Sequence, residues 1–349
     1  MRRVFAIILA FVCYAPAQAA RVDDPKANST DAGLRLIKEY RAKPDPRSVP
    51  PLIRALSERG AFKDPESSGV YVGFLAGVLG ANPRGAKTLI EQTLPLPFED
   101  QWIVIRAVAY SGLPHWRELM RDLAKRMPDR KMLAEHYLNG KLPTLATVEL
   151  EPKRATRMDK VRRVFKRETY FGAKKEPPRQ LTFVSNPELI DTHWGLYFAT
   201  GKDASIKRIV ILLPWSTERD NVEKLTIGGM AKFTLAANAT RDAKLLRLLK
   251  QLSVEQSKAV KPLLDEVIEA AETADIGRIK KEALASVDEL RRKGPGSKRE
   301  LAWWGKVGEA TLSLGCLGAA VAGQVEFGLP CVVGGALSTA ALRYFASPE

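Results

Sequence analysis

The stretch VLGANPRGAKTLIEQ at residues 78–92 has a counterpart, TLAANATRDAKLLRLLKQ, at residues 234–251. Each begins as the end of an apolar helix that contains Gly or Ala, passes through an Ala-Asn turn, and continues as a second helix with Leu or Ile spaced for burial. A further pair, AYSGLPHWRELM at 109–120 and FATGKDASIKRIV at 198–210, shares an aromatic helix, a Ser-Gly or Thr-Gly break and a second helix. The sequence therefore predicts helical hairpins that recur along the chain.

Local signals favour helices between these stretches as well. Ser48 stands at an N-cap position, Pro50 and Pro51 suit a first helical turn, and Gly60 suits a helix end. The apolar run RIVILLPW at 208–215 admits a buried strand, but the pattern on either side favours a helix. We therefore expect an all-α fold.

One hairpin is too small to bury its apolar stripe, so neighbouring hairpins must complete one another's core. In outline, residues 31–145 and 186–293 resemble α-solenoid proteins of the HEAT and TPR type, in pattern only. The TPR signature of Trp, Leu-Gly and Tyr at fixed offsets is absent, and a compact, non-repetitive helical domain is the alternative. The resemblance implies a helical-hairpin repeat array with a long concave face that binds a partner rather than turning over a substrate.

The first 20 residues, MRRVFAIILAFVCYAPAQAA, have the order of a secretory signal: a basic head, an apolar run and a small-residue stretch. We expect export with cleavage near Ala19. An N-terminal membrane anchor is the alternative, although the apolar run is shorter than the roughly 20 residues that span a bilayer. The export signal indicates a bacterial periplasm, while Asn28 and Asn238 in glycosylation motifs leave a eukaryotic secretory path open.

The chain of 349 residues is long enough for two domains or one repeat array. We expect, in chain order, a signal peptide, a linker, an N-terminal helical block, a basic connector, a C-terminal helical block, and an apolar hairpin with a basic and Trp-containing lead-in. The corresponding ranges are 1–19, 20–30, 31–145, 146–185, 186–296 and 297–349.

The chain is strongly basic, with a formal net charge of +15 that falls by two when Arg2 and Arg3 leave with the signal. An exported basic protein has little access to nucleic acid, so we expect no nucleic-acid partner. Its counterparts are anionic lipid headgroups, acidic envelope polymers or acidic proteins.

The basic charge is concentrated in the connector, where residues 151–180 hold eleven Lys or Arg against four acidic residues. Met158, Val161 and Phe165 fall at helical spacing and predict a short amphipathic helix. The candidate basic contact surface around this stripe consists of Arg157, Lys160, Arg162, Arg163, Lys166 and Arg167. It lies against an anionic surface, or else the stripe packs on a neighbouring block and the charges are solvated.

Motifs for catalysis or metal binding are scarce. The chain has three histidines, His115, His136 and His193, and contains no H-E-x-x-H, G-x-S-x-G, S-x-x-K or P-loop pattern. Asp191 and His193 lie two residues apart on a predicted helix, so they point to different faces and do not form an orienting pair. We therefore predict no catalytic, cofactor-binding or metal-binding residue. Trp102, Trp194 and Trp215 are expected in the core.

The apolar tail TLSLGCLGAAVAGQVEFGLPCVVGGALSTAALRYF at 311–345 is interrupted by turn residues at 323–330, which predicts two helices. Small residues repeat every four positions on each helix and let two backbones approach closely; they are Gly315, Ala319, Gly323, Ala336 and Ala340. Antiparallel folding places Cys316 opposite Cys331, and we expect a disulfide between them in an oxidising compartment.

A basic lead-in with two tryptophans precedes this hairpin: Arg291, Arg292, Lys293, Lys298, Arg299, Trp303 and Trp304. Such residues suit a headgroup boundary, so the hairpin is either associated with a membrane or buried against the helical body or a second copy.

The sequence thus favours an exported interaction or scaffold protein of the bacterial envelope, with no cofactor. One alternative is a membrane-active protein that inserts the Gly/Ala hairpin as it oligomerises, and another is an enzyme of unfamiliar layout. The oligomeric state is not determined by the sequence.

Overall fold

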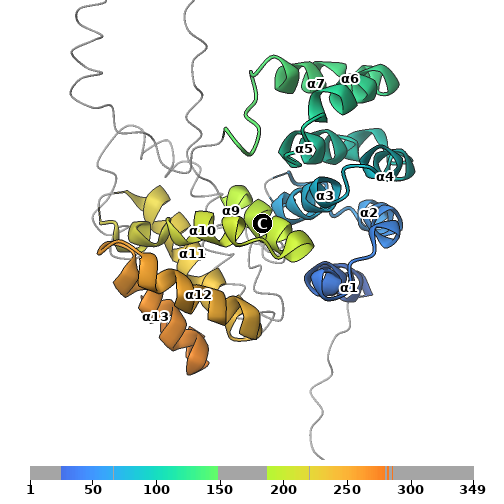
Figure 1. The fold of residues 1–349 in the computed structure, drawn as a ribbon. Coiled ribbons are helices and arrows are strands. Elements are labelled where there is room, and N and C mark those ends of the chain that lie inside the picture. The colour runs from blue at the N-terminus through green and yellow to red at the C-terminus, as the bar shows by residue number, and fades with distance from the viewer. Residues whose placement is uncertain are drawn as a thin grey trace, which may run out of the picture.

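The computed structural model describes residues 25–65, 67–147, 187–219 and 221–279, together with 281, 282 and 285. Throughout these residues the chain forms α-helices and short 3-10 turns, and no strand occurs among them (Figure 1). The predicted all-α character is confirmed for this part of the chain. The run at 208–215, which could have formed a buried strand, contains none. A helix ends within it at Val210, and a 3-10 turn begins at Leu213.

The N-terminal block rises through successive helices on one side of Figure 1. Helix α1 begins at Pro25, within the segment predicted as a linker, because proline is compatible with a first helical turn. The helices of this block are α1 (Pro25–Glu39), α2 (Val49–Glu58), α3 (Gly69–Ala81), α4 (Ala86–Thr93), α5 (Trp102–Tyr110), α6 (Trp116–Arg126) and α7 (Lys131–Leu138), with 3-10 turns η1 (Tyr40–Ala42), η2 (Pro46–Ser48), η3 (Phe98–Asp100) and η4 (Pro128–Arg130).

The C-terminal block, as far as the structure describes it, includes the longest helix, α11, with 18 residues. Its helices include α9 (Pro187–Thr200), α10 (Asp203–Val210), α11 (Val222–Ala239), α12 (Ala243–Glu255) and α13 (Lys261–Glu272), with the 3-10 turn η5 (Leu213–Thr217) between α10 and α11. Helix α11 packs against η5, α12 and α13, so it is the centre of this block.

Each of the paired stretches contains parts of two successive helices. Residues 78–92 connect α3 to α4, and residues 234–251 connect α11 to α12. In the second pair, α5 passes to α6 and α9 passes to α10, and the two breaks contain Gly112 and Gly201 with φ of +67° and +66°. Because both glycines adopt the left-handed conformation that ends a helix, each break is a matched αL exit.

The start of α2 differs in detail from the expectation. Ser48 occupies the N-cap position, but its side chain caps no helical N–H and instead donates to the Asp45 carbonyl oxygen. Asp45 caps the preceding turn by accepting from the Arg47 backbone N–H at 3.1 Å. Pro50 lies in the first turn and Gly60, with φ of +73°, follows the helix end, as predicted.

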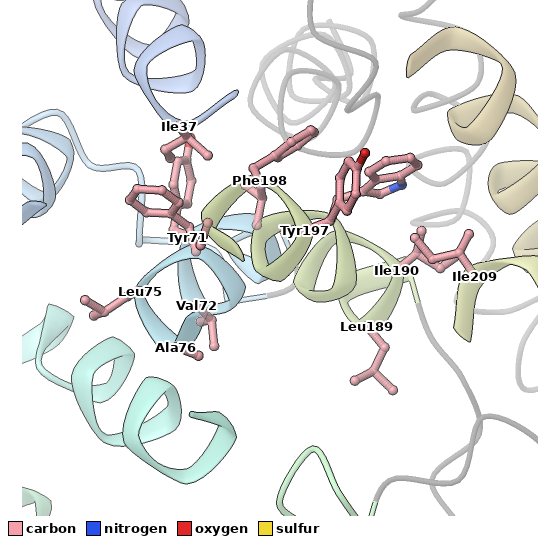
Figure 2. Packing of buried hydrophobic residues seen from close by; sticks show 14 of the residues in the cluster. Ile37, Tyr71, Val72, Leu75, Ala76, Leu189, Ile190, Tyr197, Phe198 and Ile209 are labelled. Carbon is pink, nitrogen blue, oxygen red and sulfur yellow. The ribbon is translucent and has the colours of Figure 1, made fainter. Parts of the chain in front are cut away.

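The two blocks meet where α3 lies along α9, the most extensive contact between elements of the described chain (Figure 1). Helix α3 is buried on every side, because α5 packs against its opposite face. In Figure 2, Val72 and Ala76 of α3 lie on the side away from Ile37 of α1, while Tyr71 lies beside Ile37. The C-terminal block therefore joins the middle of the N-terminal block through α3.

Glycine makes this contact close. A Cβ on Gly69 would overlap the Glu188 carbonyl oxygen, one on Gly73 would overlap the Thr192 carbonyl oxygen, and one on Gly195 would overlap the Val70 carbonyl oxygen. We call these three glycines, with the backbone that they touch, the glycine seam. Close backbone approach of this kind increases dispersion contact along both helices.

The core continues from the seam into an aromatic cluster. The Trp194 ring stacks on Phe198 with centroids 5.7 Å apart, and Tyr40 meets Phe74 edge-on at 5.0 Å. Trp102, Trp194 and Trp215 are all buried, as predicted. Among the residues that the structure describes, no helix has the length and apolar character needed to cross a lipid bilayer.

Candidate functional site

A groove of about 480 Å³ opens between the two blocks, where the end of α5 and the α5–α6 break face α9 and the start of α10. Part of this lining belongs to the paired stretches 109–120 and 198–210, although Gly201 of the α9–α10 break is not among the lining residues. A third segment, residues 144–146, completes the lining. The volume lies in the range of ligand-binding sites, and both blocks contribute to it.

The walls of the groove are largely apolar. Tyr110 and Trp116 line it from the N-terminal block, and Leu196 lines it from α9; all three side chains are half-buried. Tyr110 is held in place by Tyr137 of α7, whose ring it meets edge-on at 6.4 Å. The groove therefore offers rigid aromatic surface that is reachable from solvent.

The polar groups of the groove come mostly from the C-terminal block. His193 is 7 % exposed, and Nδ1 of its ring has no hydrogen-bond partner among the described residues. Burial, helped by the nearby Arg208 charge, lowers the pKa of His193 to about 4, so its imidazole is neutral near pH 7. Ser205, also buried, and the exposed Arg208 lie on α10 and line the same wall.

An ion pair beside the seam joins the blocks. Arg106 of α5 donates to the Glu188 carboxylate of α9, and the two side chains are 24 % and 17 % exposed. The guanidinium of Arg106 also lies 4.9 Å from the centre of the Trp102 ring. Burial raises the pKa of both Tyr110 and Tyr137 nearby, so these phenols stay neutral. The pair therefore links α5 to α9 directly.

A second polar contact joins η1 to the α11–α12 turn. Arg41 donates to the Asp242 carboxylate, and the Tyr197 hydroxyl lies 3.5 Å from the same oxygen. Asp242 also caps α12, because its other oxygen accepts from the Lys244 and Leu245 N–H groups. Burial, followed by the charge of Arg241, lowers the pKa of Lys38 to about 8.

Asp191 is completely buried in α9, close to the seam. Its Cβ lies 3.1 Å from the position that a Cβ on Gly69 would occupy. Both carboxyl oxygens lack a hydrogen-bond partner among the described residues. Burial, followed by the Glu188 charge, raises the pKa of Asp191 well above its ordinary value, which favours the neutral acid.

These groups do not assemble into a hydrolytic triad. Within the described part of the chain no hydrogen bond joins Ser205 to His193 or His193 to Asp191. The separation of Asp191 and His193 onto different faces is the arrangement predicted from their spacing. The same residues also contain no His, Cys, Asp and Glu group that is arranged to hold a metal ion.

A second groove, of about 590 Å³, lies between α2 and α4 within the N-terminal block. Its lining includes Pro46, Pro50 and Pro51, and its Arg54 already donates to the Gln92 carbonyl oxygen. We regard the groove between the blocks as the stronger candidate site, because it combines aromatic walls with a buried polar group that has no partner.

The site residues predicted from the sequence lie outside the described residues. This applies to the cysteine pair, the small residues of the hairpin, the basic surface of the connector and the basic and Trp-containing lead-in. The groove itself was not predicted. Both of the similar helix–Gly–helix stretches contribute residues to it, but their similarity alone does not place them together.

Comparison with protein-family models, with curated proteins and with solved structures finds no match for this chain. Function is therefore inferred from the groove and its residues.

Proposed function

We propose that the protein is an exported interaction protein of the bacterial envelope that binds a segment of a partner protein in the groove between its two helical blocks. The observation that carries the proposal is the composition of this groove. Half-buried aromatic side chains and a buried histidine converge there from both blocks. Aromatic anchors in a concave site, with a few polar groups to fix orientation, are typical of binding sites.

The proposal includes a repeat arrangement of the helices. The hairpins α3–α4 and α11–α12 share one sequence plan, and α5–α6 shares another with α9–α10. Stacked hairpins of this kind place successive turns along one face of the molecule. In this arrangement α5–α6 and α9–α10 both contribute residues to the groove.

The cellular location of the protein and the roles of its two terminal segments are also part of the proposal. The signal sequence supports export to the periplasm, and the C-terminal hairpin with its Cys316–Cys331 disulfide anchors the protein at the membrane or closes its core. Insertion of that hairpin by an oligomer is the second candidate function, because its small residues recur at the spacing that favours close helix contact.

A crosslinking experiment tests the binding proposal. A photoreactive amino acid is placed at Ala204, which is exposed in the groove. The full chain is expressed in the organism that naturally produces the protein, so that its partner is present. The control carries it at Val254, which is 81 % exposed on α12, outside the groove lining. We expect a discrete protein adduct from position 204 and none from 254. The same adducts from both positions, or none from either, would contradict the proposal.

A further inference from the structure

The groove has an unbalanced charge. Arg208 is its charged residue, and no Asp or Glu is among the described residues that line it. Arg208 is exposed and forms no ion pair with any described residue. A cation beside an apolar surface without an acidic neighbour is complementary to an incoming anion.

Two further groups of the lining can donate a hydrogen bond. Ser205 carries a hydroxyl group, and the neutral ring of His193 carries one N–H. The hydroxyls of Tyr110 and Thr144 already have partners in Tyr137 and Thr147. An Arg guanidinium that shares a groove with neutral donors matches the acceptor oxygens of a carboxylate, and charge-assisted hydrogen bonds are stronger than neutral ones.

We propose that the groove selects a partner segment in which an acidic side chain is flanked by apolar residues, with the carboxylate at Arg208 and the apolar side chains between Tyr110, Trp116 and Leu196. This inference rests on the proposed function and adds the chemistry of the partner. A protein segment suits the groove because its lining combines apolar side chains with the single charged side chain of Arg208.

A carboxylate bound at Arg208 should also change the pKa of His193. Arg208 lies near enough to help lower the pKa of His193, so a carboxylate bound at Arg208 offsets that charge. The His193 ring is therefore a reporter of occupancy within the groove. The chain has only two other histidines, His115 and His136, so its ring signals can be assigned by substitution.

The test uses two acetylated and amidated hexapeptides with the full mature chain. Both contain two leucines and a phenylalanine, and they differ in a central glutamate or glutamine. Binding is measured by fluorescence anisotropy at low salt, and His193 is observed by NMR. The variants are Arg208→Gln and, as a matched control, Arg247→Gln, an exposed arginine on α12 outside the groove lining.

We expect the glutamate peptide to bind about tenfold more tightly than the glutamine peptide, as a charge-assisted hydrogen bond implies. Arg208→Gln should remove this difference, Arg247→Gln should retain it, and the His193 signals should move while those of His136 do not. Both substitutions are at exposed positions, and unchanged thermal unfolding verifies that the fold is intact.

Equal binding of the two peptides, no binding of either, or equal losses in the two variants would overturn the inference. Equal losses would indicate attraction to the basic surface as a whole. A crosslink from position 204 to residues 148–186 of the same chain would identify the connector as the occupant and would also overturn it. If position 204 captures a partner regardless of Arg208 and salt, the proposed function stands and only the acidic specificity fails.

Discussion

Gly73 of α3 lies directly against the Thr192 carbonyl oxygen of α9, so close that a single Cβ at residue 73 would overlap this oxygen. The two residues belong to different blocks and are separated by the whole basic connector. The contact sets how near the blocks can come. Since the groove is lined by both blocks, its shape depends on this approach.

Gly73→Ala should destabilise the protein by about 1–3 kcal/mol, because backbone atoms rather than a movable side chain occupy the space. The loss is expected even though alanine favours helix formation by up to about 1 kcal/mol. Urea unfolding followed by circular dichroism measures it. Gly85→Ala is the control, since its new Cβ would meet nothing closer than 3.9 Å, and a similar loss there would contradict the account.

The Arg106–Glu188 pair should contribute more to stability than an exposed pair. Both side chains are largely buried and hydrogen-bonded, so we expect a coupling free energy of about 1.5–3 kcal/mol from a double-mutant cycle with Arg106→Met and Glu188→Gln. The matched cycle uses Arg126 and Glu91, whose side chains are 45 % and 39 % exposed. That pair should give less than about 1 kcal/mol. Equal coupling in the two cycles would show that Arg106 and Glu188 do not lock the blocks.

The helices and the breaks between them could be predicted from the sequence because their signals are local. Gly112 and Gly201 end helices within a few residues of the apolar patterns that define them. The pairing of α3 with α9 could not be predicted. Glycines at 69, 73 and 77 indicate that some backbone approaches α3 closely, but they do not identify which one. The groove shares this limit, because its lining comes from segments that are distant along the chain.

The sequence predicts that Asp191 and His193 lie on different faces of α9, but it does not predict how deeply each side chain is buried. The spacing of Asp191 and His193 places them on different faces of a helix, and the structure agrees. Their opposite pKa shifts depend on how closely α3 and α10 cover each face, which is a tertiary property.

Asp191 should make the protein less stable as pH rises. Its pKa is raised in the folded state, so its contribution to stability is complete below the unfolded pKa and is lost as pH rises through the folded value. Asp191→Asn keeps a neutral side chain and removes this dependence. The variant should match the native protein near pH 4 and exceed its stability at pH 7, with the difference growing by up to about 1.4 kcal/mol per pH unit. Urea unfolding at several pH values gives the curve, and a constant difference would refute the assignment.

His193 should make the protein less stable as pH falls below 6.5. Because its pKa falls from 6.5 to about 4 on folding, its contribution is present above pH 6.5 and is lost as pH falls through 4. The loss is on the order of 3 kcal/mol, and His193→Gln should abolish it. Arg208→Gln should reduce the loss, since it removes a charge that lowers this pKa. If native and His193→Gln proteins lose stability in parallel between pH 6.5 and 4, His193 is not buried in its neutral form.

Native-state hydrogen exchange of α3 and α9, measured by mass spectrometry in the native protein and in Gly73→Ala, tests the joining of the blocks most directly. We expect amides of the two helices to exchange with the same opening free energy, and Gly73→Ala to lower both values together. If α9 exchanges through its own, easier opening that Gly73→Ala leaves unchanged, the blocks are independent and the groove between them is not a fixed site.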